Sequence, residues 1–132
     1  MVTDDHARKR IVVVVEDDKP IGELLAGAIN EEGGYRAIHV TRPSEALRTF
    51  EQVKPDLLVL DVGLPGMSGL ELYDRLHADA RLRNVPVIFE TAVSREHRAE
   101  FRKRGIRKVL EKPFDINELI ADVKELAPPI AA

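Results

Sequence analysis

The sequence contains no cysteine among its 132 residues. Disulfide bonds and thiolate metal sites are therefore excluded, and a reducing cytoplasm is the simplest setting. No apolar run is long enough to cross a bilayer, and the first ten residues carry no apolar stretch of the kind found in signal peptides. A large excess of charge of either sign is also missing, because the net charge is −3. The composition as a whole thus gives no case for nucleic-acid binding.

The residues that are present describe a globular chain. Hydrophobic residues make up 44% and charged residues 33% of the sequence, as in ordinary soluble domains. A length of 132 residues is enough for one domain with a hydrophobic core. We expect one domain over residues 8–127, with short tails at 1–7 and 128–132.

Apolar runs typical of strands alternate with segments of helical periodicity five times. The predicted strands cover 11–15, 35–40, 56–61, 85–91 and 107–113, and the predicted helices cover 21–34, 42–53, 69–82, 94–105 and 114–127. Such alternation predicts an α/β fold, with a parallel sheet between two layers of helices. The run "IVVVV" at 11–15 is apolar throughout, which is typical of a strand buried on both faces.

Ligands of open α/β sheets bind beyond the carboxyl ends of the strands, so the residues that follow each strand are the candidates for a site. In chain order they are Glu16, Asp17, Asp18, Thr41, Asp61, Thr91 and Lys112. Several carboxylates meeting in one place repel one another, and a divalent cation would relieve that repulsion. Oxygen ligands alone favour Mg²⁺, which often shares its shell with a phosphate.

Two of the three remaining candidates suit a phosphate. Lys112 supplies a compact positive charge for phosphate oxygens, and Thr91 supplies a hydroxyl that can donate a hydrogen bond. A carboxylate such as Asp61 can itself act as a phosphoryl-accepting nucleophile. Because phosphoryl transfer needs mainly positioning and charge neutralisation, the set predicts a phosphoryl-acceptor site.

Four motifs carry a resemblance to a known family. They are "VVVVEDD", "LLVLDVGLPGMSG", "ETA" and "EKPF", each at the end of a predicted strand. In this order and spacing the chain closely resembles the receiver domain of two-component response regulators, over nearly its whole length. The resemblance implies a flavodoxin-like (βα)5 sheet with strand order 2-1-3-4-5.

The resemblance also implies roles for particular residues around a magnesium ion. Asp61 is expected to be the phosphorylated aspartate and a metal ligand. Asp17 would bind the metal directly and Glu16 through water, and the backbone carbonyl of Gly63 would complete the protein's share of the shell.

Two further residues are implied to respond to the phosphoryl group. Thr91 would move its hydroxyl toward that group and Lys112 would pair with it, and the Lys112–Pro113 peptide bond is expected to be cis. The phosphoryl group would come from a sensor histidine kinase or a phosphotransfer protein.

The implied function is a cytoplasmic phosphorylation-dependent switch and not a turnover enzyme. Its output would be a changed affinity for a protein partner or a second copy, through the surface of 94–105, 107–113 and 114–127. No membrane or direct nucleic-acid partner is expected. The basic residues between Arg95 and Lys108 are either a solvated face or part of that docking surface, and we favour docking slightly. The histidines, His6, His39, His77 and His97, are interpreted as surface or structural residues and not as phosphodonors.

Three alternatives stay open. The chain could be a stand-alone receiver, which we favour, or a receiver excised from a larger regulator or hybrid kinase. It could be a binding-only receiver that signals without phosphate. From another class, it could be a magnesium-dependent phosphatase with an aspartyl nucleophile, of the haloacid dehalogenase type. Those enzymes need a second aspartate two residues after the first, where this chain has Gly63.

The sequence departs from the family at positions beside the expected site. Val109 stands three residues before Lys112, where receivers usually have an aromatic residue, so the usual aromatic switch is not available. Glu90 stands before Thr91, where the family is mostly apolar. By strand alternation we expect Glu90 to point away from Thr91, toward solvent or a partner. Neither Gly63 nor Val93 can position an attacking water by its side chain, so we expect the backbone and solvent access alone to govern self-dephosphorylation.

Overall fold

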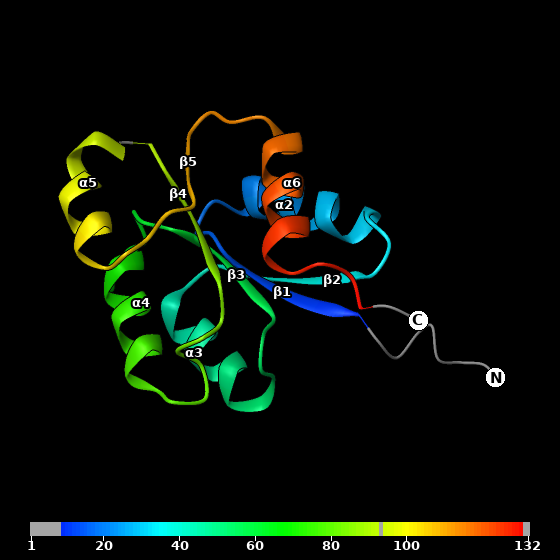
Figure 1. The fold of residues 1–132 in the computed structure, drawn as a ribbon, viewed down its shortest axis with the longest axis horizontal. Helices are drawn as coiled ribbons and strands as arrows, with labels where there is room; N and C mark the ends of the chain where they lie inside the picture. Colours follow the sequence, from blue (N-terminus) through cyan, green and yellow to red (C-terminus); the bar gives the residue numbers. More distant parts are fainter. Residues whose placement is uncertain (1–8, 93, 131–132) are drawn as a thin grey trace.

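The computed structural model describes residues 9–92 and 94–130, and the fold alternates strands and helices through that part of the chain (Figure 1). The strands are β1 (Arg10–Val15), β2 (Tyr35–Val40), β3 (Leu57–Asp61), β4 (Val87–Thr91) and β5 (Val109–Glu111). The helices are α2 (Lys19–Glu31), α3 (Pro43–Gln52), α4 (Gly69–Ala78), α5 (Ser94–Lys103) and α6 (Ile116–Leu126). All ten predicted elements are present, so the predicted α/β class is confirmed.

The five strands form one parallel sheet in the order β2-β1-β3-β4-β5. This is the order that the resemblance implied. The central strands β1 and β3 are apolar except at their ends, and every residue of β3 is buried. Neighbouring strands align Val15 with Leu60 and Leu60 with Phe89. The register therefore brings the carboxyl ends of β1, β3 and β4 to one edge of the sheet.

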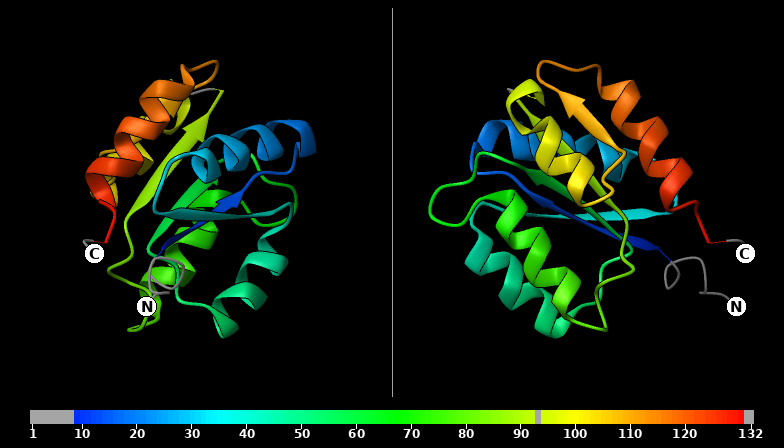
Figure 2. Two further views of the ribbon diagram at one scale, coloured as in Figure 1. Left: turned by 90° about the vertical axis from the view of Figure 1, so that its right-hand side faces the viewer. Right: turned by 60° about the vertical axis from the view of Figure 1, so that its left-hand side comes forward.

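Helices cover both faces of the sheet, with α2 and α6 on one face and α3, α4 and α5 on the other (Figures 1 and 2). Each face has its own buried cluster, because side chains alternate along a strand. Val13, Leu58 and Phe89 belong to the cluster beneath α3, α4 and α5. Their neighbours Val14 and Val59 belong to the cluster beneath α2 and α6. The sheet is thus dry on both sides, and only its edges reach solvent.

Helix caps fix where the chain turns after each strand. The Asp18 carboxylate accepts from the Ile21 N–H at 3.0 Å and caps α2. Ser68 and Glu71 form a capping box at the start of α4. These caps satisfy N–H groups that a helix leaves unpaired, and they hold the loops that contain the candidate residues.

The observed elements are shorter than several predicted ones. The helix expected over 69–82 ends at Ala78, because Asp79 turns the chain out of the helix and caps the next turn at Arg81. The strand expected over 107–113 is limited to Val109–Glu111. His6, Val93 and the outer tail residues lie outside the described residues. Within the part described, no helix is long and apolar enough to cross a membrane.

Candidate functional site

Three carboxylates meet where β1 and β3 end. Glu16 and Asp17 follow β1 and Asp61 ends β3, and carboxylate oxygens of the three residues all lie within 4.8 Å of one another. Glu16 and Asp61 are buried, whereas Asp17 is exposed. The sequence predicted this meeting point correctly, because the strands are parallel and end at the same edge.

Backbone groups hold the two buried carboxylates in place. The Gly63 N–H donates to Asp61 Oδ1 at 3.0 Å, and the Asp18 N–H donates to Glu16 Oε2 at 3.0 Å. The loop after Asp61 returns so closely that a Cβ on Gly69 would lie 2.3 Å from the Asp61 carbonyl oxygen. Only glycine fits there, so the tight packing of α4 against the end of β3 depends on Gly69.

Lys112 reaches into the cluster from the loop after β5. Its Nζ lies 3.2 Å from Glu16 Oε1 and 3.3 Å from Asp61 Oδ2. The Lys112–Pro113 peptide bond is cis, as the resemblance implied. Lys112 is also tied to β4, because its backbone N–H donates to the Thr91 carbonyl at 2.8 Å. The structure thus brings Lys112 and Asp61 into contact across the edge of the sheet.

Burial and mutual repulsion set the electrostatics of this cluster. Burial raises the pKa of Glu16; the hydrogen bond from the Asp18 N–H lowers it in part, and the Asp61 charge raises it further. Burial alone would lower the pKa of Lys112, but the carboxylates of Glu90, Asp61 and Glu16 together raise it. Lys112 therefore stays charged and offsets part of the negative charge. The excess of carboxylates that remains suits a divalent cation.

Thr91 ends β4 beside these residues and is buried, with 3% of its surface exposed. The pairing of β3 with β4 sets Asp61 opposite Glu90, one residue before Thr91. The candidate hydroxyl therefore lies one strand away from the candidate nucleophile, at the same end of the sheet. This is the placement that the spacing of the motifs predicted.

The prediction for Glu90 is wrong in one respect. Its side chain is fully buried, with 0% exposed, and does not reach solvent. Its Oε1 lies 3.6 Å from Lys112 Nζ. Helices cover both faces of strand β4, so a side chain that points away from Thr91 meets the other buried face and not solvent. Glu90 is therefore a fourth carboxylate next to the cluster, although its position suggested a surface residue.

Burial raises the pKa of Glu90 to about 8, with a further contribution from the neighbouring Glu16 charge. Sequence reasoning missed this residue as a member of the site. A signal was available in the sequence. Glu90 is an acidic residue within the apolar run "VPVIFET", and this run forms a strand that lies between two others.

His39 is a second residue whose place the sequence did not reveal. Its Nε2 lies 2.8 Å from the Glu16 carbonyl oxygen, so the ring supports the end of β1 from strand β2. A Cβ on Gly22 would lie 1.9 Å from the same ring nitrogen. The imidazole therefore packs against the bare backbone of α2, in the structural role expected for the histidines.

Comparisons with known proteins decide the family. Residues 12–124 match the family described as "Response regulator receiver domain". The chain belongs to the response regulator receiver family. Receiver domains are phosphorylation-dependent signalling switches, so the predicted class of function is confirmed at the level of the family.

Two curated relatives show how receivers occur in longer and shorter proteins. The chain is 34% identical over 116 residues to the "Phosphate regulon transcriptional regulatory protein PhoB" of Pseudomonas aeruginosa, which covers 87% of this chain and 50% of that protein. It is 34% identical over 114 residues to the "Polar-differentiation response regulator DivK" of Brucella anthropi. This match covers 86% of this chain and 92% of that protein. The chain thus spans about half the length of the PhoB proteins and nearly all of DivK.

Solved structures agree with the fold. The receiver domain of the Francisella response regulator 1452 superposes with a TM-score of 0.80 and 32% identity, covering 90% of this chain and 97% of that one. A response regulator from Chloroflexus aurantiacus gives a TM-score of 0.82 with 28% identity, covering 90% and 98%.

The residues of this receiver fit the metal that the family implies. Three carboxylates within reach of one ion, two of them buried and none paired with a thiolate or imidazole, form the oxygen-only donor set that Mg²⁺ prefers. When bound, the ion would offset the charge of the carboxylates and of an incoming phosphoryl group.

The basic residues near α5 are only partly paired. Arg104 binds Asp74 at 2.8 Å and Glu100 at 2.9 Å, and Lys108 binds Glu125 at 2.8 Å. Among the described residues, no ion pair within 4.0 Å involves the arginines at 95, 98, 102 and 107. Several cations on this side therefore remain available to a partner.

Proposed function

We propose that Asp61 is the residue that accepts the phosphoryl group in this receiver. The observation that carries the proposal is the contact of Lys112 Nζ with Asp61 Oδ2 at 3.3 Å, in a pocket that also holds Glu16 and Asp17. One carboxylate oxygen of Asp61 would attack the phosphorus of a phosphohistidine. The nitrogen–phosphorus bond breaks, an oxygen–phosphorus bond forms, and the imidazole leaves with the electron pair.

The other residues of the site would neutralise and orient charge. Lys112 already lies between Glu16 and Asp61, so a short movement of its ammonium group brings it to a phosphoryl oxygen. Glu16, Asp17, Asp61 and the carbonyl of Gly63 would hold Mg²⁺. The Gly63 N–H keeps Asp61 Oδ1 fixed, which leaves Oδ2 on the side of Lys112.

Thr91 would convert phosphorylation into a change of shape. Its hydroxyl is expected to move toward the phosphoryl group and to pull on the loop that leads into α5. Because Val109 stands where the family usually has an aromatic residue, we infer that the signal passes through this loop and α5. The output is a changed affinity for a protein partner or a second copy, at the surface of α5, β5 and α6.

The donor would be a sensor histidine kinase or a phosphotransfer protein, and the unpaired arginines of α5 favour an acidic output partner. The proposed role is that of a switch and not of a turnover enzyme. Gly63 offers only its backbone N–H, which Asp61 accepts, where a phosphatase of the haloacid dehalogenase type has its second aspartate. A cytoplasmic setting, expected from the absence of cysteine, remains a prediction.

The experiment is an intact-mass measurement after incubation with acetyl phosphate and Mg²⁺. We expect the wild type to gain one phosphoryl mass, and Asp61→Asn to gain none. Asp56→Asn is the matched control, because Asp56 precedes the same strand at its opposite end. There its carboxylate accepts from the Ile11 N–H and from Arg10, and from no other donor in residues 9–92 and 94–130. A phosphoryl gain in Asp61→Asn equal to that of wild type would refute the assignment. Steady turnover of p-nitrophenyl phosphate would instead favour the phosphatase.

A further inference from the structure

The short strand β5 leaves part of its neighbour uncovered. Its residues pair with β4 only from Phe89 onward, so the start of β4 at Val87 has no described strand beside it on that side. A cavity of about 340 Å³ opens there and is lined in part by residues 85–87. The end of α4 and the end of α6 also line it, together with residues 105–108 between α5 and β5. Four separate segments of the chain therefore meet at this cavity.

The charge of this cavity differs from that of the whole chain. The chain has 23 acidic side chains against 20 lysines and arginines, yet among the described residues no acidic one lines the cavity. Four basic residues line it instead: His77, Arg83, Arg107 and Lys108. Lys108 is already in use, because its ammonium group binds Asp122 at 3.5 Å and Glu125 at 2.8 Å. The two arginines therefore supply the positive charge that remains.

Arg83 and Arg107 have no partner in the part of the chain that the structure describes. Neither guanidinium group takes part in an ion pair within 4.0 Å or in a side-chain hydrogen bond. A guanidinium group presents a planar set of donors that matches a carboxylate or a phosphate-type group. Two such groups at a cavity that no described acidic residue lines favour an anion there.

Aromatic and apolar side chains form the other walls of the cavity. The rings of Tyr73 and His77 are stacked, with their centroids 4.4 Å apart and an angle of 28° between their planes. Tyr73 is buried and His77 is exposed, so the histidine ring ends this stack at the surface. Val85 is buried, and Val87 and Ile106 pack against the core beneath α3, α4 and α5. Walls of this kind suit the flat apolar part of a small molecule.

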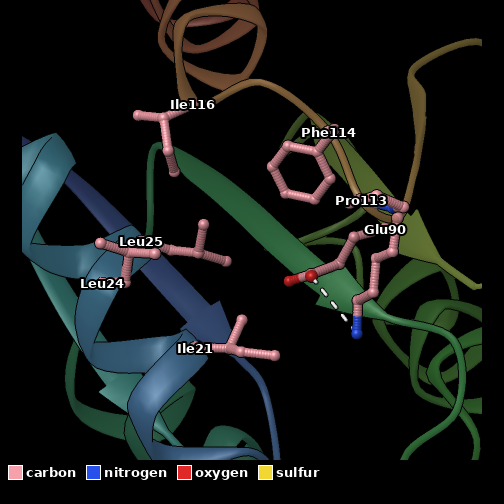
Figure 3. A pocket seen from close by; sticks show the side chains of 8 residues that line it. Ile21, Leu24, Leu25, Glu90, Pro113, Phe114 and Ile116 are labelled. Atoms are coloured by element: carbon pink, nitrogen blue, oxygen red, sulfur yellow. Dashed lines mark ion pairs between the residues drawn. The ribbon is translucent and has the colours of Figure 1, made fainter.

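A second cavity, of about 440 Å³, lies between α2 and the loop from β5 into α6 (Figure 3). It is lined by Glu90 and Lys112, which lie 3.6 Å apart. It is at the carboxyl end of the sheet and shares Lys112 with the proposed phosphoryl site. The cavity beside Val87 lies at the other end of β4 and shares no residue with that site. A ligand beside Val87 would therefore bind apart from the phosphoryl group and its metal.

We propose that the cavity beside Val87 binds a small organic anion, made of a flat apolar body and one carboxylate or phosphate-type group. The guanidinium groups of Arg83 and Arg107 bind the anionic group, and the flat body lies against His77 and residues 85–87. A volume of about 340 Å³ is near the lower end of the range for small-molecule sites, which favours a ligand of one or two rings. An extended peptide suits the cavity less well, because β5 closes the edge of β4 a short way along the strand.

The test compares phenylphosphonate, an anion that cannot donate a phosphoryl group, with benzyl alcohol, a neutral compound of similar size. Each is titrated into the whole chain in EDTA, and ¹H–¹⁵N chemical shifts give the dissociation constant and locate the binding. We expect phenylphosphonate to bind about tenfold more tightly, which is the effect of one hydrogen bond to a charged group. The shift changes should centre on residues 83–87 and 105–108. Benzylamine, a cation of similar size, is expected not to bind.

Arg83→Gln and Arg107→Gln each remove one charge at an exposed position, and together they should make phenylphosphonate bind no more tightly than benzyl alcohol. Arg36→Gln is the matched control, because Arg36 is an exposed arginine on β2, at the other edge of the sheet. It should leave the tenfold preference intact. Asp61→Asn should also leave it intact, because the proposed acceptor lies at the carboxyl end of the sheet. The result therefore does not depend on whether Asp61 is phosphorylated.

Three results would overturn the proposal. The first is equal binding of phenylphosphonate and benzyl alcohol to wild type, or no binding of either. The second is a preference for the anion that survives the double substitution of Arg83 and Arg107, since the anion would then bind elsewhere. The third is a preference that is lost in Asp61→Asn, which would place the probe at the phosphoryl site.

Discussion

The buried Glu90 carboxyl should make the stability of this receiver fall as pH rises. In the folded chain its pKa is raised from 4.5 to about 8, so between these values the folded state binds a proton that the unfolded state releases. The stabilising contribution is fully present below pH 4.5 and is lost as pH rises through 8. Between pH 5 and pH 8 the loss is about 3 kcal/mol, at about 1.4 kcal/mol for each unit of pKa difference that is crossed.

Glu90→Gln isolates this contribution because the amide has nearly the same shape and does not titrate in this range. The free energy of unfolding is measured in urea by far-ultraviolet circular dichroism, in EDTA, at several values between pH 5 and pH 8.5. We expect the variant to be similar to wild type at pH 5 and more stable by about 3 kcal/mol at pH 8. Glu16 also has a raised pKa, so part of the slope remains in the variant.

The prediction is tested by the difference in free energy of unfolding between wild type and Glu90→Gln, followed as a function of pH. Glu51→Gln removes an exposed carboxylate and should follow the wild-type curve at every pH. If wild type and Glu90→Gln stay parallel to within about 0.5 kcal/mol, which is the usual effect of a surface change, the buried carboxyl does not titrate as argued. A variant that is less stable by the same amount at all pH values would point to lost packing and would refute the electrostatic reasoning.

Three further predictions rest on single contacts. Lys112→Met should slow phosphorylation by acetyl phosphate about 100-fold, because among the described residues Lys112 is the one cation that pairs with Asp61. An intact-mass time course measures the rate, and an unchanged rate would contradict the role of Lys112. Gly69→Ala should cost about 1–3 kcal/mol of stability, since its Cβ would meet a backbone carbonyl at 2.3 Å. Gly27→Ala, which meets nothing within 4 Å, should cost nothing in the same urea measurement. Tyr35→Phe removes the 2.7 Å hydrogen bond to the Ala127 carbonyl and should cost about 1 kcal/mol, with retention of the full wild-type midpoint as the contrary result.

Much of the fold could be predicted because each strand carries its own signal. "IVVVV" and "LLVLD" are apolar on both faces, and each ends at an acidic residue. In a parallel sheet such ends gather at one edge, so the order of elements alone places Glu16, Asp17 and Asp61 at the same edge of the sheet. The strand order came from the family resemblance, since periodicity does not say which strands are neighbours.

The surroundings of Glu90 could not be predicted by the same reasoning. Alternation along a strand gives the side of the sheet to which a residue points, but not whether that side is covered. Whether the face of β4 that carries Glu90 is exposed to solvent depends on how α6 and the loop after β5 fold back over it. That arrangement depends on contacts between residues far apart in sequence, such as Lys112 with Glu16. Alternation therefore predicts that Glu90 points away from Thr91, toward solvent or a partner, although that side of its strand is buried.

The same reasoning explains why Val109 and Glu90 are best considered together. Both residues lie on neighbouring strands at the end of the sheet where the proposed phosphoryl site is, since Glu90 pairs with Leu110, the residue after Val109. Val109 lacks the bulk that the family usually places beside its switch, and Glu90 adds a buried carboxyl group 3.6 Å from Lys112. A receiver with both changes has no aromatic side chain to move on the α5 side of the sheet, and it has a buried carboxyl group to accommodate on the α2 side.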